Sequence, residues 1–360
     1  MNPSTTIPSV SVVTATRGRP ENLAQLVPIV LADESVRHFV VVIDGDDPDS
    51  LALLSSLKAH FERLVFAQIP RAGQLRALDD GVALTDADVV LMLDDDVVPM
   101  AGLATAHARA HANESGLVLV GAMPVELPAR HADIGSLLYA RDYLAYLARI
   151  EAGEHGVLDQ LWLGNVSIRR SDCLSVGLHS SRFTASYHAD QDLGFRLAGA
   201  GLVGRYDPSL GAVHRHRRTG PAFLRDARRR GAGVAHLHAV HERLGTFDPA
   251  VFTQDLPAPV ATVVGHVGSS RVAPVVARAL LGMAGALESL RCESGWVVLA
   301  KLGRRVMFVR GATAGEIAGP PAADAKDTTD PATLGRSGSP SDLDTHRDLG
   351  REAPAKLAVG

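Results

Sequence analysis

Short, continuous apolar runs alternate with amphipathic segments through roughly the first hundred residues of this 360-residue chain. Continuous apolar runs are typical of strands that are buried on both faces of a parallel sheet. Strands that alternate with helices at this spacing form right-handed crossover units. The expected strands are 9–15, 38–43, 63–69 and 88–93, and the expected helices are 20–32, 49–60 and 72–84. The sequence therefore predicts an α/β fold in which helices flank a mostly parallel central sheet.

Polar residues follow these strands, at the sheet edge where ligands bind in folds of this kind. Thr14, Thr16 and Arg17 follow the first strand, and Asp44 follows the second. The fourth strand ends in three acids, 94–96. A solvated loop could account for each of these groups alone, but it does not account for their coincidence at one edge. We therefore expect the carboxyl ends of these strands to form a binding site.

The acid run in LMLDDDVVP, 91–99, is the part of this edge most suited to chemistry. Three consecutive carboxylates cannot be buried unpaired, because desolvating one charge costs several kcal/mol. Since residues i and i+2 of an extended chain point the same way, Asp94 and Asp96 are expected to converge while Asp95 turns aside. Carboxylate oxygens suit a hard divalent cation such as Mg or Mn better than Zn or Cu. The alternative is a solvated acidic turn that caps the next helix.

The composition excludes several functional classes. A net charge of −4 argues against a general nucleic-acid binder. The two cysteines, Cys173 and Cys292, form no C-x-x-C pair, so we expect neither a disulfide scaffold nor a thiolate metal site, and this usage fits a reducing cytoplasm. We expect no signal peptide in MNPSTTIPSV, and no apolar run approaches the roughly 18 residues needed to span a bilayer. A cytoplasmic protein is therefore predicted.

The second half of the chain is less regular. The expected elements are a strand at 116–125, a helix at 134–150, a strand with a helix after it at 161–172, a short helix at 190–201, two short strands ending in His214 and His216, a basic helix at 221–243, and helices at 272–290 and 296–309. Asp190 is expected at the N-cap of its helix. The basic residues at 169–170 and 215–230 either form a solvated face or bind an anionic partner. From about 311 the chain has no aromatic residue and is expected to be disordered.

Residues 271–309 combine an apolar face with basic side chains. The expected apolar face comprises Val272, Val276, Leu280, Met283 and Leu287. The basic side chains of the second expected helix are Lys301, Arg304 and Arg305. Helices of this kind either pack on the rest of the protein or lie in the interface of an anionic membrane without spanning it. Packing is the commoner case in globular proteins, and peripheral contact with the inner face of a membrane is the alternative.

Several motifs along residues 9–245 stand in an order that resembles glycosyltransferase family 2, whose members are inverting enzymes of the GT-A fold that use nucleotide-diphospho-sugars. The matching segments are SVVTATRGRPENL, VVVIDGDD, AGQLRALDDG, LMLDDD, LGNVSIRR, ADQDLGFRLAGAG and AVHRHRR. Two positions depart from the family pattern. Gly45 stands where a second aspartate is usual, and Ala189 replaces the usual acid before Asp190. The resemblance implies a GT-A fold and a sugar-transfer activity.

The resemblance also implies a role for particular residues. The donor-binding residues would be Thr14, Arg17, Asp44, Arg76, Asp94 and Asp95. A divalent cation, Mn or Mg, would be held by Asp94, Asp96 and His214. Asp190 would be the general base that takes the proton of the acceptor hydroxyl, with Asp192 as the next candidate. An N-cap position would lower the pKa of Asp190. The implied partners are a nucleotide-diphospho-sugar donor and a glycan, lipid-linked or small-molecule acceptor.

The expected organisation and the alternatives complete this interpretation. The expected parts are a catalytic domain at 1–245, with a nucleotide-binding half at 9–98 and an acceptor half at 99–245, a helical extension at 246–310 and a disordered tail at 311–360. One alternative is a nucleotidyltransferase of similar fold, although TRGRP, 16–20, has only one glycine for a phosphate loop. Another is a non-catalytic sugar- or nucleotide-binding module, which Ala189 favours. No G-x-G-x-x-G follows the first strand, so a dinucleotide-binding oxidoreductase is disfavoured.

Overall fold

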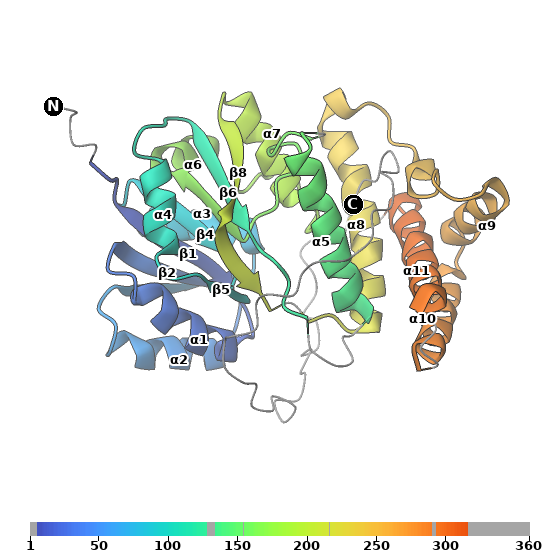
Figure 1. The fold of residues 1–360 in the computed structure, drawn as a ribbon, viewed down its shortest axis with the longest axis horizontal. Coiled ribbons are helices and arrows are strands. Elements are labelled where there is room, and N and C mark those ends of the chain that lie inside the picture. The colour runs from blue at the N-terminus through green and yellow to red at the C-terminus, as the bar shows by residue number, and fades with distance from the viewer. Residues whose placement is uncertain (1–5, 128–133, 154, 216, 290–292, 316–360) are drawn as a thin grey trace.

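The computed structural model describes residues 6–127, 134–153, 155–215, 217–289 and 293–315. Within them, eight strands form one sheet in the order β3-β2-β1-β4-β7-β6-β8-β5, drawn as arrows in Figure 1. The strands are β1 (Val10–Thr16), β2 (Val36–Asp44), β3 (Leu64–Ile69), β4 (Val89–Leu93), β5 (Val97–Pro99), β6 (Leu117–Ala122), β7 (Asn165–Arg169) and β8 (Val203–His214). The helices packed around the sheet are α1 (Pro20–Leu31), α2 (Pro48–Lys58), α3 (Gln74–Ala83), α4 (Leu103–Ala110), α5 (Ile134–Glu151), α6 (Arg170–Val176), α7 (Ala189–Gly199) and α8 (Gly220–Val240).

Strands β1 to β4 are parallel, and β1 lies between β2 and β4. The predicted fold class is therefore confirmed for the first half of the chain. In the second half, β7 runs antiparallel to both β4 and β6, while β6 and β8 are parallel. Because the first four strands are parallel, their carboxyl ends lie at one edge of the sheet.

Helices cover both faces of the sheet, and each face has its own core. Val41 of β2 packs in the core that holds α1, α2 and α4. Its neighbour Val40 packs in the core that holds α3, α6 and α7. Successive strand residues point to opposite faces. Continuous apolar strands are therefore needed to fill both cores.

The structure corrects the sequence analysis in the region around β5 and β8. The short strand β5 and the helix α4 were not predicted. β8 is one strand instead of two, because its start pairs with β6 and its end pairs with β5. The pairing is irregular between Asp207 and Gly211, where Pro208 cannot donate a ladder hydrogen bond. That interruption explains why the sequence predicts two short strands here.

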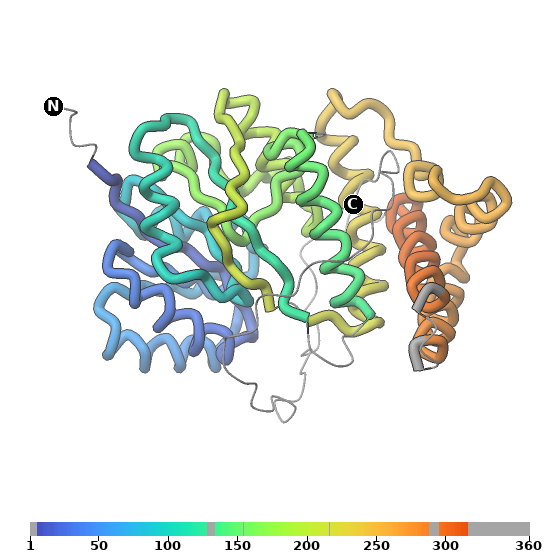
Figure 2. Tube along the Cα trace, viewed as in Figure 1, coloured from blue at the N-terminus to red at the C-terminus, as the bar shows by residue number. Residues whose placement is uncertain are grey.

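The C-terminal helices lie together at the end of the molecule away from α1 and α2 (Figure 1). They are η1 (Glu242–Leu244), η2 (Pro249–Phe252), α9 (Ala258–Ser269), α10 (Ala273–Ser289) and α11 (Glu293–Thr313). α11 lies along α8, although many residues separate them in the chain (Figure 2). The expected disorder from 311 is wrong for residues 311–313, which belong to α11. Residues 316–360 of the expected tail lie outside the described residues.

Glycine permits the close approach of α11 and α8. A Cβ on Gly311 would overlap the carbonyl oxygen of Arg228, and a Cβ on Gly231 would overlap the carbonyl oxygen of Phe308. Each helix therefore has a glycine where the backbone of the other helix touches it. Aromatic and aliphatic side chains of both helices fill the rest of a shared core.

The buried face of α10 is not the one expected from the sequence. Ala273, Ala277 and Ala284 are fully buried, whereas Val272 and Met283 of the expected face are about half exposed. Small side chains let α10 approach α11 more closely than valine or methionine would. Of the expected apolar face, Val272 and Met283 therefore point outward, whereas Leu287 packs against the shared core. Within the residues that the structure describes, none of the helices is both long and apolar enough to cross a membrane.

Candidate active site

A cavity of about 670 Å³ opens at the carboxyl ends of β1, β2 and β4. One side of it contains Thr16, Asp44 and Asp94, which end or follow these three strands. Residues of α5, α7, α8 and α11 line the rest. The sheet edge and four helices from the second half of the chain thus enclose one site.

Asp94, Asp96 and His214 bring three potential ligand atoms together at the sheet edge. These atoms all lie within 4.8 Å of one another. Oδ1 of Asp96 lies 3.0 Å from Nε2 of His214, because β8 ends beside the acid turn that follows β4. Two carboxylates and an imidazole form a donor set that suits a divalent cation such as Mn.

Burial and neighbouring charges shift the pKa values within this group. Burial raises the pKa of Asp94 to about 7, and the nearby charge of Asp96 adds to the shift. Burial would lower the pKa of His214, but the hydrogen bond and charge of Asp96, with the charge of Asp94, raise it overall. Both shifts mean that the site attracts positive charge, which a proton or a cation can supply.

The acid between them, Asp95, turns to the loop after β1. It accepts hydrogen bonds from Thr16 Oγ1 at 2.8 Å and from Arg19 Nη1 at 2.7 Å. Arg19 also donates to Asp96 at 3.0 Å. The charge of Asp95, more than any other group, raises the pKa of Arg19 above its usual value. Asp95 therefore ties the first loop to the acid turn. The sequence analysis missed Arg19, although it lies in the same short loop as Arg17.

Two neighbours hold the side chain of Asp94 in place. Gln74 Nε2, at the start of α3, donates to Oδ1 of Asp94 at 2.8 Å. Gly164 has a φ of +118°, and a Cβ at this position would lie 2.5 Å from Oδ2 of Asp94. Glycine is required here both for its backbone conformation and for the room that it leaves to the carboxylate. Gln74 was not expected at this site from the sequence.

The expected donor residues Asp44 and Arg17 both line the cavity. The carboxylate of Asp44 accepts hydrogen bonds from the backbone N–H of Ala72 at 2.6 Å and of Gly73 at 3.1 Å. Part of its hydrogen-bonding capacity thus fixes the turn before α3. Arg71, in the same turn, lines the cavity and has a buried Nη2 without a hydrogen-bond partner in the described part of the chain.

Two other expected donor residues are placed less favourably. Thr14 is fully buried and does not line the cavity, because it lies two residues deeper in β1 than Thr16. Arg76 lines the cavity, but its guanidinium forms an ion pair with Asp80 one turn further along α3. Thr16 is therefore the threonine of this strand that reaches the site.

Asp190 lies in the first turn of α7 and not at its N-cap. His188 occupies the cap position, with a left-handed φ of +67°. Burial raises the pKa of Asp190 to about 6, against the lowering effect of the Gln191 N–H. The expected lowering of this pKa is wrong, because the loss of water around the carboxylate outweighs the helix dipole. A carboxylate with this pKa is a stronger base than an exposed one.

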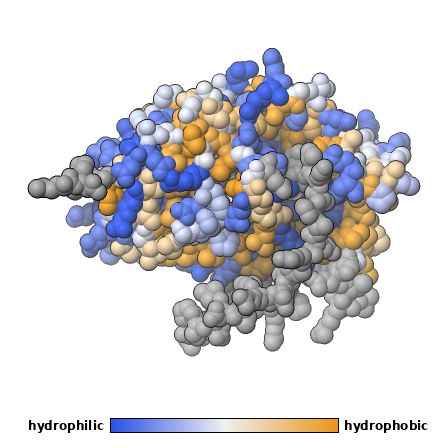
Figure 3. Space-filling view, turned by 45° about the horizontal axis from the view of Figure 1, so that its top comes forward, coloured by the Kyte–Doolittle hydropathy of each residue, from blue (hydrophilic) through white to orange (hydrophobic). Residues whose placement is uncertain are grey.

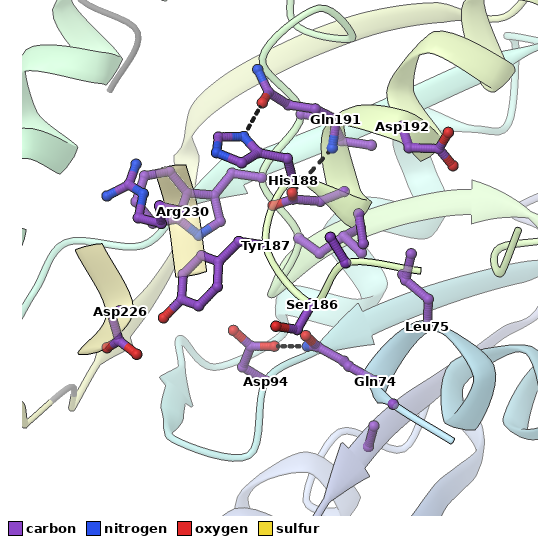
Figure 4. A pocket seen from close by; sticks show the side chains of 18 of the residues that line it. Gln74, Leu75, Asp94, Ser186, Tyr187, His188, Gln191, Asp192, Asp226 and Arg230 are labelled. Atoms are coloured by element: carbon purple, nitrogen blue, oxygen red, sulfur yellow. Dashed lines mark hydrogen bonds between the residues drawn. The ribbon is translucent and has the colours of Figure 1, made fainter. Parts of the chain in front are cut away.

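Asp192, the alternative base, is fully engaged in structural contacts. It is 1% exposed. Its oxygens contact Nε of Arg196 at 2.9 Å and Nε2 of His241 at 2.8 Å. In Figure 4 its carboxylate points away from Asp94 and Tyr187. Asp192 therefore ties α7 to the segment that follows α8.

The comparisons with known proteins agree with this architecture. Residues 11–161 match the model of glycosyl transferase family 2. This part of the chain belongs to that family. The resemblance seen in the sequence is confirmed, and the protein is a glycosyltransferase. No curated protein matches the chain.

A solved structure, that of PcManGT, has a similar fold. The mannosyltransferase PcManGT from Pyrobaculum calidifontis, in complex with GDP-Man and Mn2+, is 14% identical, with a TM-score of 0.54 over 86% of this chain and 89% of that chain. GalNAc-T7, solved with UDP, GalNAc and Mn2+, is 13% identical, with a TM-score of 0.48 over 66% of this chain and 51% of that chain. The likeness to PcManGT extends beyond the family match and includes most of the second half.

Several residues that were not expected from the sequence line the cavity of this glycosyltransferase, and Figure 4 shows them around Tyr187 and His188. His188 Nδ1 bonds to Oε1 of Gln191. Burial lowers the pKa of His188 to about 4, so its ring is neutral at pH 7. Tyr187 bonds to Asp226, and the guanidinium of Arg230 lies 5.9 Å from the ring centre of Phe308. The basic run 225–230 was visible in the sequence, but helical spacing alone did not show which arginine faces the site.

The C-terminal helix α11 contributes to the same wall. Arg304 pairs with Asp142 of α5 and is only 16% exposed. Its guanidinium lies 5.7 Å from the ring centre of Phe223 and 5.6 Å from that of Phe308. Of the basic side chains expected on this helix, Arg304 therefore packs inward. On α5, Tyr139 Oη lies 3.3 Å from Nδ1 of His214 and so connects this wall to the acid turn.

The segment LGNVSIRR belongs to the expected acceptor half of the chain. Part of this segment is buried and has a structural role. Asn165 Nδ2 donates to the carbonyl oxygen of Leu210 at 2.8 Å, and its Oδ1 lies 3.1 Å from Nε2 of His107. Ser167 Oγ lies 2.8 Å from a ring nitrogen of both His107 and His111. Burial lowers the pKa of His107 to about 3 and of His111 to about 4. This neutral network fastens α4 to the sheet behind the cavity.

The two arginines at the end of that segment are also structural. Arg169 donates to the carbonyl oxygen of His111, and Arg170 donates to that of Val82. Neither lines the cavity. The expected anionic partner is thus not supported for this pair, while Arg230 of the second basic run does line the cavity. His216, the expected end of the second short strand, lies outside the described residues.

Proposed function

We propose that this glycosyltransferase moves a sugar from a nucleotide-diphospho-sugar to an acceptor hydroxyl with inversion at the anomeric carbon. The observation that carries the proposal is one shared cavity, which holds the group Asp94, Asp96 and His214 and also holds Asp190. The first three residues would hold a cation at the leaving diphosphate. Asp190 would take the proton of the attacking hydroxyl. A single displacement needs these two functions on opposite sides of the sugar.

The residues at the acid turn fit a divalent cation. Three donor atoms lie close together, and burial with like charge raises the pKa of Asp94 to about 7. Gly164 leaves the space into which the Asp94 carboxylate fits. Mn or Mg bound there would supply positive charge to the phosphate oxygens of the leaving group. Of the two, the imidazole of His214 favours Mn.

Asp190 supplies the base for the acceptor. Its raised pKa of about 6 keeps it largely ionised at neutral pH and still able to accept a proton. As the acceptor oxygen bonds to the anomeric carbon, its proton passes to the Asp190 carboxylate, and the bond from that carbon to the diphosphate breaks. The diphosphate leaves with the electron pair of that bond. One displacement of this kind inverts the anomeric configuration.

The donor would be recognised along the sheet edge. Asp44 and Arg17 line the cavity beside the carboxyl ends of β1 and β2. Arg71 has a buried Nη2 without a partner in the described residues, and this N–H suits a phosphate or ribose oxygen. We propose these three residues, with Thr16, for donor binding. PcManGT is solved with GDP-Man, so guanosine diphosphate is a first choice of probe.

The division of the chain also remains a proposal. The catalytic domain would extend to about residue 245, and α9, α10 and α11 would form the helical extension. α11 shares a core with α5 and α8, and its Arg304 and Phe308 line the cavity. The extension is therefore proposed as part of the working enzyme.

A nucleotide-sugar screen tests the proposed function. The melting temperature of the protein is measured with GDP- and UDP-sugars, in the presence of Mn and in the presence of EDTA. A donor that binds the folded state raises the melting temperature by mass action. We expect a rise with Mn that EDTA removes, followed by transfer to a hydroxyl acceptor with inverted configuration by NMR. Retention of configuration, or nucleotide binding that EDTA does not change, would contradict the proposal.

A further inference from the structure

The helix α10 presents a row of apolar residues to solvent. We name this row the outer stripe. It consists of Val275, Ala279 and Met283 on α10, together with Val272 in the turn directly before the helix. Val275 is 60% exposed and Met283 is 50% exposed. Spacings of three and four residues place the stripe on one side of the helix. The opposite side, with Ala277 and Ala284, packs inward.

Apolar exposure continues on the two neighbouring helices. Val263 of α9 is 60% exposed, and Val298 of α11 is 55% exposed. Figure 3 shows hydrophobic residues reaching the surface at the end of the molecule formed by these helices. Isolated exposed valines need no explanation, but a group spread over three adjacent helices indicates an interaction surface.

Within the chain segment that carries the outer stripe, the charged residues are basic. Between Leu256 and Leu287 the sequence contains Arg271 and Arg278 but no aspartate or glutamate. Both arginines are exposed. Arg278 lies on α10, and Arg271 lies in the turn directly before this helix, next to Val272 of the stripe. Apolar residues with arginines beside them match a layer that has an apolar interior and an anionic surface.

We propose that the outer stripe binds the surface of a membrane that contains anionic lipid. α10 lies in the plane of the membrane, its apolar side chains enter the boundary below the headgroups, and Arg271 and Arg278 contact lipid phosphates. The binding is peripheral, since no described helix is long and apolar enough to cross a bilayer. This surface is separate from the cavity, and the proposal does not depend on the transfer reaction.

A second copy of this chain fits the surface less well. A two-fold interface places the same patch on both partners. The segment around Arg271 and Arg278 would then face the same segment of the second copy, which contains no carboxylate to pair with these arginines. Burying unpaired charges is unfavourable. Lipid phosphates supply the negative charge that a second copy lacks.

Sedimentation of the full chain with lipid vesicles tests the proposal. One set of vesicles contains phosphatidylcholine alone, and the other contains equal parts of phosphatidylcholine and phosphatidylglycerol. We expect the protein to sediment with the anionic vesicles and to stay in solution with the neutral ones. Raising the salt from about 0.1 M to about 1 M, which shortens the Debye length from about 10 Å to about 3 Å, should release it.

Two double variants separate the apolar and basic contributions. Val275→Asp with Met283→Asp should abolish sedimentation. The matched control is Leu144→Asp with Leu174→Asp, which changes helical leucines that are 61% and 51% exposed on α5 and α6 and should sediment like the wild type.

Arg271→Gln with Arg278→Gln should weaken binding to anionic vesicles roughly 30-fold. An unchanged melting temperature in each variant shows that folding is intact.

Three results would overturn the proposal. The first is equal sedimentation of the wild type and the Val275→Asp, Met283→Asp variant. The second is equal binding to neutral and anionic vesicles. The third is a dimer in solution that Met283→Asp converts to a monomer while neither form sediments with vesicles, which would assign the surface to a second copy of the chain.

Discussion

Nε2 of His214 lies 3.0 Å from Oδ1 of Asp96, and this contact joins the last residue of β8 to the acid turn after β4. The two residues are far apart in the sequence and meet because β5 pairs with β8 directly after the turn. A residue from the second half thereby completes the group that begins in the first half. Loss of either side chain should therefore affect the same property, the Mn-dependent binding of a nucleotide.

We expect Asp96→Asn to remove the Mn-dependent part of nucleotide binding while the protein stays folded. The exchange removes one carboxylate charge from the three-residue group at the sheet edge. Wild-type protein at a nucleotide concentration about 100 times its Kd should gain about 2.7 kcal/mol of stability from binding. In the variant, Mn should add nothing to this gain. Thermal shift with GDP, with and without Mn, measures both values.

Asp46→Asn is the control for this exchange. Asp46 also follows a strand at the same edge, but it is exposed and does not line the cavity. Its variant should keep the full Mn effect. If Asp46→Asn and Asp96→Asn lose the effect equally, general acidity of the edge and not the three-residue group is responsible.

We expect Asp190→Asn to slow transfer by about 10²–10⁴-fold, the usual range for loss of a general base. In the wild type, kcat/KM should rise with pH through about 6 and then level off, since Asp190 is active when ionised and its pKa is about 6. The variant should lose this rise. Transfer rates from pH 5 to pH 8 measure the profile, and an unchanged rise in the variant would assign it to another group.

The same exchange should stabilise the fold at neutral pH. Folding raises the pKa of Asp190 from its usual value of 3.8 to about 6, so the folded state is penalised once the carboxylate is ionised. The penalty is absent below the unfolded pKa, grows as the pH rises between the two values, and is complete above about 6. Asp190→Asn should therefore gain up to about 3 kcal/mol at pH 8 and little at pH 4. Urea denaturation at the two pH values measures the free energy of unfolding of both proteins. A gain of equal size at both pH values would show that ionisation of Asp190 is not its cause.

Acid should destabilise the fold through His107 and His111. Burial lowers the pKa of His107 to about 3 and of His111 to about 4, whereas an unfolded histidine has a pKa near 6.5. The stability that depends on these neutral histidines is fully present above about pH 6.5. It is lost as the pH falls towards their pKa values in the folded state. Each histidine should cost about 1.4 kcal/mol per pH unit within that window. Unfolding by urea at pH 7 and pH 5 measures the loss, which His111→Gln should reduce.

We expect Gly311→Ala to destabilise the protein by about 1–3 kcal/mol, the usual cost of overpacking a core. The added methyl group would overlap the carbonyl oxygen of Arg228 and push α11 away from α8. Gly282→Ala on α10 is the matched control, because nothing lies within 4 Å of a Cβ at that position. It should be neutral or stabilise by about 0.5–1 kcal/mol. Equal melting temperatures for the two variants would contradict the close helix contact.

The fold of the first half follows from its sequence because local and global signals agree there. Val40 and Val41 are both apolar, which indicates a strand covered on two faces, and the structure packs them in two different cores. The family resemblance extended the prediction into the second half. β5, with only three residues, has no local signal strong enough to predict, and its pairing with β8 depends on distant residues.

The candidate site was predictable where a polar residue directly follows a strand. Asp44, Asp94 and His214 are of this kind, and all three line the cavity. Arg304 and Tyr139 were not predictable, because a helix offers several directions and only tertiary packing selects one. The pKa of Asp190 was predicted in the wrong direction for a related reason. Sequence position suggests a helix dipole, but it does not reveal how much water the folded cavity removes.

The contact between α8 and α11 has a consequence for the order in which the site is completed during synthesis. β1 leaves the ribosome early, and the sheet edge has all its residues once His214 has emerged. The wall that contains Arg304 and Phe308 cannot form until α11 has been made and has docked against Gly231. A chain released before that point would carry the donor edge with one wall missing. The cavity would then be open to water on the side that α11 closes in the complete chain.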